Sequence, residues 1–283
     1  MVKILEAIGA VSSVIMAFLL EIAASVERVE PAPSSASLSA SSPAYGDADY
    51  WHERYAATSA PSSSSSPPSY EWLLSWVQLK SYLEPELQGR PRILHPGCGS
   101  STLGTDLRES GFGGELTMNS DISPAVIEQM QRLHPECVYV VDDALSMSAA
   151  RRAVCGNFEE EEDVQNRFFD CVLDKGTLDA FACTTGTQAE KRAVVHRYLN
   201  EVRAILDPAN GRFLCISFGQ PETRKHYFPA DEWRTLKVQP IVVSRSPQKE
   251  EGEDSRGEEA DGDGGSTAIT EKFFLYVLAP IPK

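Results

Sequence analysis

The chain has 283 residues, of which 42% are hydrophobic, and a formal net charge of −15. This length accommodates one large domain with extensions, and the hydrophobic share is ordinary for a globular protein. Two acidic stretches, at 159–163 and 249–263, hold most of the negative charge. Such runs are typical of solvated loops, and the alternative is that they attract a basic partner protein. The acidic balance and the lack of a basic run argue against nucleic-acid binding.

The N-terminal residues 1–44 are expected to precede the folded domain. Residues 4–26 are largely apolar, and a linker rich in Ser, Ala and Pro follows them. Two acidic residues, Glu6 and Glu21, leave the apolar run short for a membrane-spanning helix. We therefore expect a cytoplasmic protein, with a membrane anchor or signal through residues 4–26 as the alternative.

Residues 45–283 are expected to form one domain with three flexible insertions. These lie near 58–68, 156–166 and 247–268, where serine runs or acidic runs interrupt the sequence. None of the six cysteines forms a CxxC pair, and the five histidines have no metal-ligand spacing. The cysteines therefore indicate reduced thiols rather than disulfides, and no metal site is expected.

From residue 92 onward, predicted strands alternate with predicted helices. Strands are expected at 92–95, 116–120, 137–141, 168–173, 212–218, 235–243 and 272–278, and helices at 102–110, 124–134 and 188–206. Ser123 is expected to cap the second helix, with Pro124 in its first turn. The alternation predicts an α/β fold, which is a Rossmann-like, seven-stranded, mostly parallel sheet with helices on both faces. The last two strands are expected to form an antiparallel hairpin at one edge.

A glycine-rich turn, Gly97-Cys98-Gly99, follows the first of these strands. Glycine lets the backbone turn tightly and approach a ligand without a Cβ in the way. A dinucleotide fingerprint would require a third glycine at position 102, where this chain has Thr102. An NAD-dependent oxidoreductase is therefore disfavoured.

Acidic residues stand at the ends of the next two predicted strands. Asp121 ends the second strand, and Asp142 and Asp143 follow the third. In open α/β sheets, ligands bind beyond the carboxyl ends of the strands. Asp121 could accept hydrogen bonds from two ribose hydroxyls, and Asp142 or Asp143 could reach an adenine amino group. With the glycine turn, these acids favour an adenosine-type cofactor, and the alternative is a tight turn with helix-capping carboxylates.

Five motifs resemble those of the class I, seven-β-strand methyltransferases that use S-adenosylmethionine. Within that class they are similar to the methyltransferase-like proteins that methylate lysines of translation elongation factor 1-alpha, the family of elongation factor 1-alpha lysine methyltransferase 4. The motifs are 50–55 (YWHERY), 70–72 (YEW), 93–101 (ILHPGCGSS), 121–123 (DIS) and 174–180 (DKGTLDA). The resemblance covers residue 45 to the C-terminus.

The chain departs from the family pattern in two of these motifs. The family usually has Leu-Gly-Cys-Gly-Asn-Ser where this chain has Pro-Gly-Cys-Gly-Ser-Ser at 96–101, and His52 replaces the usual aspartate. Serine can still donate and accept hydrogen bonds, so cofactor binding is expected to survive.

The resemblance implies that the cofactor is S-adenosyl-L-methionine. Its predicted binding residues are Arg54, Gly97, Cys98, Gly99, Asp121, Ile122, Asp142, Asp143 and Asp174. Arg54 could clamp the methionine carboxylate of the cofactor with two hydrogen bonds. Without the resemblance, a surface salt bridge on an amphipathic helix is the favoured interpretation of Arg54.

In the fold that the resemblance implies, the loop after the fourth strand faces the transferable methyl group. Its sequence is therefore more informative about the methyl acceptor than about the cofactor. The predicted catalytic residues are Asp174, Gly176 and Thr177. Asp174 is expected to face the methyl centre and position the acceptor amine, and the alternative is a loop-capping carboxylate. Tyr70 and Trp72 are predicted walls of the lysine channel, and the alternative for Trp72 is a core aromatic.

The leading hypothesis is a monomeric protein-lysine N-methyltransferase that acts on a protein like elongation factor 1-alpha. One alternative is a small-molecule methyltransferase on the same scaffold. Another is a catalytically silent cofactor-binding scaffold, although the retention of Asp121 and Asp174 argues against it.

Overall fold

The computed structural model describes residues 44–58, 71–113, 116–155, 168–245 and 269–282. The chain divides into two units, and the larger unit comprises residues 45–243 and 272–283, whereas the smaller comprises residues 1–44 and 244–271. The sheet core, the cavity and the contacts considered below belong to the larger unit. Apart from Ala44 and Thr58, the predicted N-terminal segment and the three predicted insertions lie outside the described residues, so their limits stay predictions.

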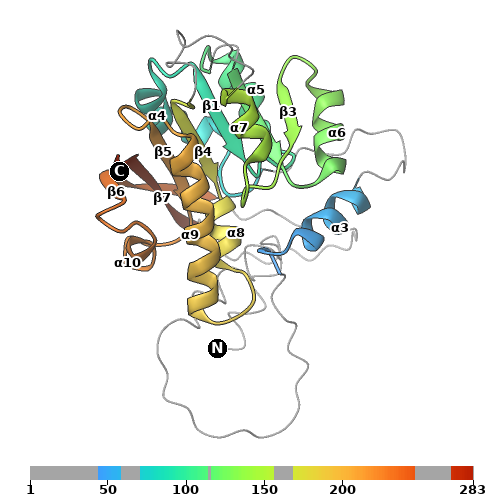
Figure 1. Ribbon diagram of the computed structural model, residues 1–283. Coiled ribbons are helices and arrows are strands. Elements are labelled where there is room, and N and C mark those ends of the chain that lie inside the picture. The colour runs from blue at the N-terminus through green and yellow to red at the C-terminus, as the bar shows by residue number, and fades with distance from the viewer. Residues whose placement is uncertain (1–43, 59–70, 114–115, 156–167, 246–268, 283) are drawn as a thin grey trace, which may run out of the picture. The chain divides into compact units, whose positions relative to one another are not determined.

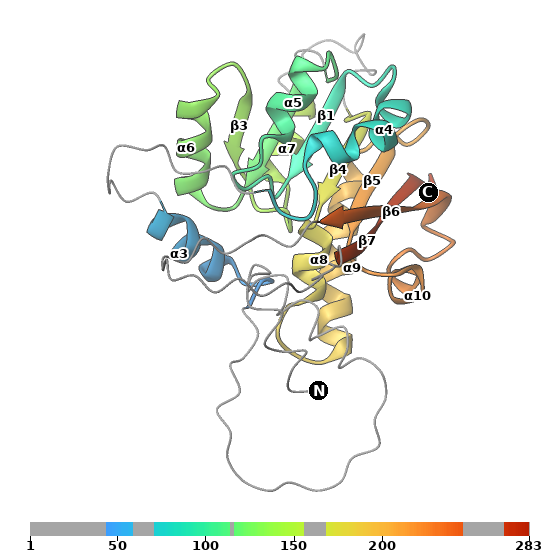
Figure 2. The ribbon, with the colours of Figure 1, turned by 180° about the vertical axis from the view of Figure 1, so that it is seen from behind.

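Seven strands in the described residues form one sheet. They are β1 (Arg92–Pro96), β2 (Leu116–Asp121), β3 (Val138–Val141), β4 (Cys171–Lys175), β5 (Arg212–Ser217), β6 (Trp233–Arg245) and β7 (Ile269–Pro280). Their order across the sheet is β3-β2-β1-β4-β5-β7-β6, as Figures 1 and 2 show from two sides. β1 to β5 pair in parallel, and β7 runs antiparallel to β5. The predicted mostly parallel sheet with antiparallel C-terminal strands is confirmed.

Helices cover both faces of this sheet (Figures 1 and 2). The α-helices of the described residues are α3 (Ala48–Thr58), α4 (Trp76–Leu87), α5 (Leu103–Glu109), α6 (Pro124–Leu133), α7 (Ser148–Cys155), α8 (Thr177–Ala182), α9 (Gln188–Ile205) and α10 (Pro221–Arg224), of which α3 lies beyond the ends of the strands (Figures 1 and 2). α4 and α5 contribute to the apolar core on one face, and α7, α8 and α9 contribute to the core on the other. Because both faces are covered, the central strands are buried along their whole length.

The long helix α9 follows the periodic pattern that predicts it. Its apolar stripe packs into the core, and these buried residues are Val195, Tyr198, Leu199, Val202 and Ile205. Thr187 caps its first turn in a capping box with Glu190, in which the Thr187 side chain accepts from the Glu190 N–H and the Glu190 carboxylate accepts from the Thr187 N–H. None of the helices in the described part is long and apolar enough to cross a lipid bilayer, and residues 4–26 lie outside that part.

Two local predictions need correction. The fourth strand begins and ends later than predicted, because parallel pairing with β5 continues as far as Lys175 opposite Ile216. Lys175 and Asp174 therefore belong to the strand and not to the loop after it. Ser123 occupies the N-cap position of α6, but its hydroxyl makes no capping hydrogen bond and is buried without a partner. The helices α7 and α8 lie where no helix was predicted.

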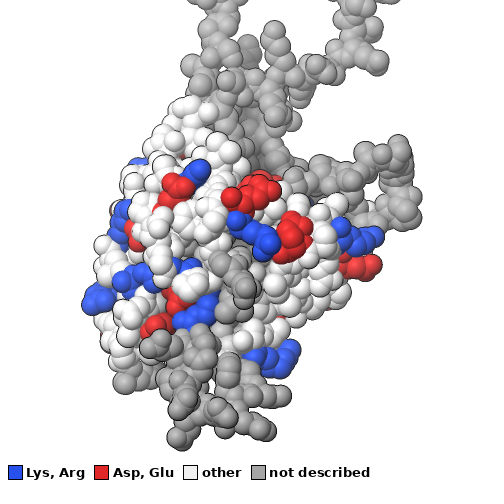
Figure 3. All heavy atoms as spheres, turned by 90° about the horizontal axis from the view of Figure 1, so that it is seen from above, with Lys and Arg blue, Asp and Glu red and all other residues white. Residues whose placement is uncertain are grey.

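The described surface of the molecule carries charges of both signs. Figure 3 shows Lys and Arg side chains interspersed with Asp and Glu side chains on the face seen from above. Basic and acidic groups lie next to one another in several places (Figure 3), so this face presents a mixed surface rather than a field of one sign.

Candidate cofactor and acceptor site

A cavity lies at the carboxyl ends of β1, β2, β3 and β4, where open α/β sheets bind ligands. The structure brings most of the predicted site residues to its wall. These are Arg54, Trp72, Gly97, Cys98, Gly99, Asp121, Ile122, Asp142, Asp143, Gly176 and Thr177. Asp174 is not on the wall, and Tyr70 lies outside the described residues. Several further residues of the wall were not predicted from the sequence, among them Tyr45, Trp51, Tyr55, His95, Lys175 and Phe181.

The glycine turn after β1 is shaped by close neighbours on two sides. Gly97 and Gly99 adopt φ values of 62° and 52°, in the left-handed region that favours glycine. A Cβ on Gly97 would collide with Oγ1 of Thr177, whose hydroxyl donates to the carbonyl of Pro96 at 2.9 Å. A Cβ on Gly99 would collide with the hydroxyl of Tyr55. The turn therefore places its backbone directly against Thr177, just after β4, and against α3.

Asp121 joins the end of β2 to this turn. Its Oδ2 accepts from the backbone N–H of Gly99 at 3.0 Å, and its Oδ1 accepts from the N–H of Ser123 at 2.9 Å. Burial raises the pKa of this carboxyl, while the two backbone N–H groups act in the opposite direction. Because each oxygen can accept more than one hydrogen bond, Asp121 can still bind hydroxyl groups of a ligand in the cavity.

The two acids after β3 have different partners, which the sequence alone left undecided. Both carboxylate oxygens of Asp142 accept from the first turn of α7, at 3.0 Å from Ala149 N and 2.9 Å from Ala150 N. Asp143 is partly exposed, and its Oδ1 accepts from Leu145 N at 2.8 Å. Asp142 thus caps a helix, while Asp143 is the better placed of the two to receive a ligand donor.

Asp174 does not face the cavity, contrary to expectation. Its side chain is fully buried, and Oδ1 accepts from Thr177 N, while Oδ2 accepts from Leu178 N and the Tyr198 hydroxyl. Burial raises the pKa of this carboxyl to about 7, with the Tyr198 hydrogen bond opposing the rise. Alternate residues of a strand share a face, so Asp174 points with Val172 toward α9. Asp174 therefore caps α8, which was the alternative interpretation.

Trp72 forms part of the cavity wall. A Cβ on Gly176, which has a φ of 89°, would lie only 2.6 Å from Cδ1 of the Trp72 ring. The indole also packs edge-on against Tyr45 and Trp51, with ring centroids 5.6 and 5.9 Å apart. The indole is therefore wedged between the loop after β4 and an aromatic cluster near α3.

Arg54 lies on α3 and lines the same cavity. Its Nη1 donates to the Tyr50 hydroxyl at 3.4 Å. The guanidinium is therefore placed on the cavity wall by the helix that also carries Trp51 and Tyr55.

The second aspartate of the 174–180 motif, Asp179, is also fully buried. Its carboxylate accepts from the Ser217 hydroxyl, from Phe218 N at 2.8 Å, and from the guanidinium of Arg224 at 2.9 Å. Arg224 lies on α10, so this ion pair ties α8 to the segment after β5. Both aspartates of the motif thus hold the segment after β4 in place through hydrogen bonds made inside the protein, away from the cavity.

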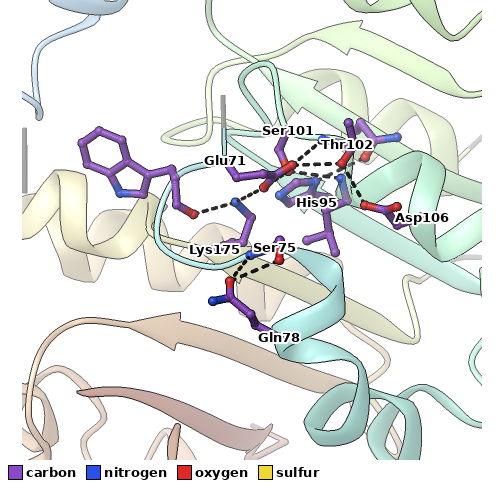
Figure 4. Close-up of polar contacts among 11 residues, drawn as sticks. Glu71, Ser75, Gln78, His95, Ser101, Thr102, Asp106 and Lys175 are labelled. Atoms are coloured by element: carbon purple, nitrogen blue, oxygen red, sulfur yellow. Dashed lines mark hydrogen bonds and ion pairs between the residues drawn. The ribbon is translucent and has the colours of Figure 1, made fainter. Parts of the chain in front are cut away.

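A buried polar cluster on the other side of the loop was missing from the sequence analysis (Figure 4). The carboxylate of Glu71 binds Lys175, Ser101 and Thr102 at once. His95 lies on the cavity wall beside this cluster, and burial with the nearby Lys175 charge lowers its pKa to about 4. No sequence signal pointed to this cluster, because the fourth strand was predicted to end at residue 173, before Lys175, and only the structure places that lysine inside the buried strand.

Comparison with known proteins gives matches to one group of enzymes, although no family model matches the chain. The chain is 32% identical over 195 residues to EEF1A lysine methyltransferase 4 of Bos taurus. This match covers 66% of the present chain and 67% of the bovine protein. The chain is 31% identical over 220 residues to the eEF1A lysine and N-terminal methyltransferase of Homo sapiens, covering 74% of this chain and 28% of that protein. The chain therefore spans about two thirds of the first relative and little more than a quarter of the second.

A solved structure shares the fold. The SAM-dependent methyltransferase from Anabaena variabilis matches with a TM-score of 0.52 at 15% identity, over 82% of this chain and 94% of that one. The seven-stranded sheet and the cavity at its carboxyl edge agree with that fold. By sequence, the chain belongs to the EEF1A lysine methyltransferase 4 family, and its fold is that of the class I methyltransferases that depend on S-adenosyl-L-methionine.

Proposed function

We propose that the chain transfers a methyl group from S-adenosyl-L-methionine to a lysine side chain of a protein like elongation factor 1-alpha, as a monomer in the cytoplasm. The observation that carries this proposal is the match to EEF1A lysine methyltransferase 4. It is supported by the position of the motifs that resemble that family, because residues from them line one cavity. The glycine turn, the 174–180 segment and Trp72 all border that cavity.

The residues present fit this cofactor. The Cβ-free turn at Gly97 and Gly99 gives a ligand close access to the backbone, and Asp121 lies beside it as an acceptor for ribose hydroxyls. Asp143 is the proposed partner of the adenine amino group, and Arg54 is the proposed partner of the methionine carboxylate. When bound, the cofactor supplies a methyl group on a sulfonium, which an amine nitrogen can attack directly.

The chain's own task is to present a neutral amine and exclude water. A lysine amine in water has a pKa of about 10.4, so it must lose its proton before it can attack. The aromatic wall formed by Trp72, Trp51 and Tyr45 favours the neutral form by desolvation and attracts the cation on its way in. Lys175 is unsuited to act as the base, because it is buried as the ion-pair partner of Glu71.

Asp174 contributes to this task indirectly. It fixes the N–H groups of Thr177 and Leu178, and thereby the path of the backbone at Gly176 and Thr177 that borders the cavity. We therefore propose Asp174 as a positioning residue. Its catalytic contribution arises from holding the loop, since a well-held loop keeps the acceptor aligned with the methyl group.

The test is transfer of labelled methyl from S-adenosyl-L-methionine to purified elongation factor 1-alpha, with cofactor affinity measured in parallel by calorimetry. Asp121→Ala is expected to lose both cofactor binding and labelling. Asp174→Ala is expected to keep cofactor binding and to lower labelling. Glu86→Gln, at a half-exposed pair with Lys237, is the control that keeps both. Cofactor binding without any protein labelling would contradict the proposal and direct the search to small acceptors.

A further inference from the structure

Glu71 connects three segments that lie far apart in the sequence (Figure 4). Its Oε1 accepts from the backbone N–H of Thr102 at 2.7 Å. Its Oε2 accepts from the Ser101 hydroxyl and from Nζ of Lys175, both at 2.9 Å. Ser101 and Thr102 lie two and three residues after Gly99 of the glycine turn, and Lys175 directly precedes Gly176 on the acceptor side. One carboxylate therefore contacts both halves of the site.

The lysine of this pair, Lys175, is almost completely buried. The Lys175 side chain is 2% exposed, and its ammonium also donates to the backbone carbonyl of Trp72 at 2.7 Å. A buried ammonium is costly unless an opposite charge and hydrogen-bond acceptors surround it. Glu71 and the Trp72 carbonyl supply both. The position of Lys175 therefore depends on Glu71, and the position of the Trp72 backbone depends on Lys175.

The backbone beside Trp72 needs such support. Leu73 adopts a φ of 68°, a left-handed conformation that is uncommon for a residue with a branched, bulky side chain. The Trp72 carbonyl accepts a second hydrogen bond from Leu74 N at 3.1 Å, which closes a tight turn around Leu73. Strained backbone persists where its surroundings hold it in place. Lys175 holds the carbonyl, and Gly176 contacts the indole ring.

We propose that Glu71 and Lys175 are positioning residues that couple cofactor binding at the glycine turn to the placement of Trp72 on the acceptor wall. Ser101 lines the cavity that would hold the cofactor, Ser101 and Thr102 hold Glu71, Glu71 holds Lys175, and Lys175 fixes the strained turn that carries the indole. Coupling of this kind is reciprocal, so anything that fixes Trp72 also tightens cofactor binding. The description of Trp72 as an acceptor wall rests on the proposed function, whereas the link between the turn and Trp72 does not.

The test follows Trp72 fluorescence during titration with S-adenosylhomocysteine, without any acceptor. Each variant is compared with the same variant carrying Trp72→Phe, and the difference isolates the Trp72 signal from that of the other tryptophans. In the unmodified chain the signal changes as the ligand binds. In Glu71→Gln the change at saturation is lost, and the dissociation constant rises by about 5-fold or more, the usual scale of such coupling. An unaltered Trp72 change in Glu71→Gln overturns the proposal.

A double-mutant cycle keeps the test decisive if Glu71→Gln folds poorly. Lys175→Met removes the ammonium that Glu71→Gln would leave unpaired, so the double variant removes both charges together. Coupling predicts that the double variant binds S-adenosylhomocysteine no more weakly than either single variant, and additive losses overturn it. Glu86→Gln breaks a more exposed lysine–glutamate contact away from the cavity, at 3.3 Å from Lys237, and is expected to change neither readout. Because no acceptor is used, failure here leaves the proposed function standing, and failure to methylate lysine leaves this coupling testable.

Discussion

The hydroxyl of Tyr198 donates to Oδ2 of Asp174 at 2.8 Å, and both side chains are fully buried. Tyr198 lies on α9, on the far side of the sheet from α4 and α5. This contact directs the first residue of the acceptor motif into the protein interior and away from the cavity. Asp174 therefore acts through the backbone that it caps, and its partner on α9 contributes to the stability of that arrangement.

Tyr198→Phe is expected to destabilise the fold while leaving the cofactor site intact. The substitution removes one of three donors from a buried carboxylate, at a cost of about 1–3 kcal/mol in the free energy of unfolding. The N–H groups of Thr177 and Leu178 still hold Asp174, so the affinity for S-adenosylhomocysteine is expected to stay within about twofold of the unmodified value, well below the tenfold that 1.4 kcal/mol represents. Urea denaturation and calorimetry measure the two quantities.

Tyr276→Phe is the matched control for this prediction. Its hydroxyl donates to the neutral carbonyl of Gly219 at 2.7 Å, so its loss is expected to cost about 1 kcal/mol, less than the loss of a bond to an ionisable group. An equal or larger loss of stability in Tyr276→Phe would contradict the special weight given to the Tyr198–Asp174 contact.

Asp179→Asn is expected to be among the more damaging substitutions in the acceptor motif. It leaves the guanidinium of Arg224 buried without its counter-charge, which costs about 3–5 kcal/mol in unfolding free energy. The control is Glu84→Gln, which breaks the exposed contact with Lys80 and is expected to cost within about 0.5 kcal/mol. Chemical denaturation compares the two, and a loss under about 1 kcal/mol for Asp179→Asn would show that the buried pair contributes little.

Gly97→Ala is expected to weaken cofactor binding by about tenfold or more, because a strained backbone and a clash with Thr177 Oγ1 together exceed the 1.4 kcal/mol that a tenfold change represents. Gly89→Ala is the control for a general effect of backbone strain, because Gly89 also has a left-handed φ, of 69°, but has open space around its Cβ position and does not line the cavity. Calorimetry with S-adenosylhomocysteine is expected to show unchanged affinity in Gly89→Ala. Equal weakening in both variants would indicate a general loss of fold.

His95 is expected to make stability fall on acidification. Burial lowers its pKa to about 4 in the folded chain, against about 6.5 in an unfolded one. The unfolded chain therefore takes up the proton first, so the contribution is present above pH 6.5 and is lost as the pH falls toward 4, by up to about 3 kcal/mol. Urea denaturation at about pH 7 and about pH 5 is expected to show a larger loss for the unmodified chain than for His95→Leu.

This comparison has to be made as a difference between the two chains. Burial raises the pKa of Asp174 to about 7, so its contribution is present below pH 4 and is lost as the pH rises through 7, opposite in sign to that of His95. Asp174 is common to both chains and cancels in the difference. An identical pH dependence of the unmodified chain and of His95→Leu would show that His95 is not held neutral.

The cofactor side of the site could be predicted from sequence because topology fixes it. Gly97 and Asp121 stand at the ends of neighbouring parallel strands, and such ends necessarily meet at one edge of the sheet. Their residue types then limit the ligand. The resemblance to known methyltransferases added the residues of α3, such as Arg54, which no strand pattern would have brought to the cavity.

The orientation of Asp174 could not be predicted, because it depends on where β4 ends. If the strand ended at Leu173, Asp174 would be free to turn toward the cofactor. The strand continues to Lys175, so the alternation of side chains assigns Asp174 to the α9 face and Lys175 to the opposite face. The partner of Lys175 lies 104 residues earlier in the chain, at Glu71, and only tertiary packing brings the two together.

The most direct test of the central claim is fragmentation mass spectrometry of elongation factor 1-alpha after incubation with this chain and S-adenosyl-L-methionine. The expected result is added methyl mass on a lysine side chain, absent with Asp121→Ala and retained with Glu86→Gln. Methyl mass found solely on the terminal amine or in a small molecule, or lysine methylation that persists in Asp121→Ala, would contradict the assignment of this cavity as the site of lysine methyl transfer.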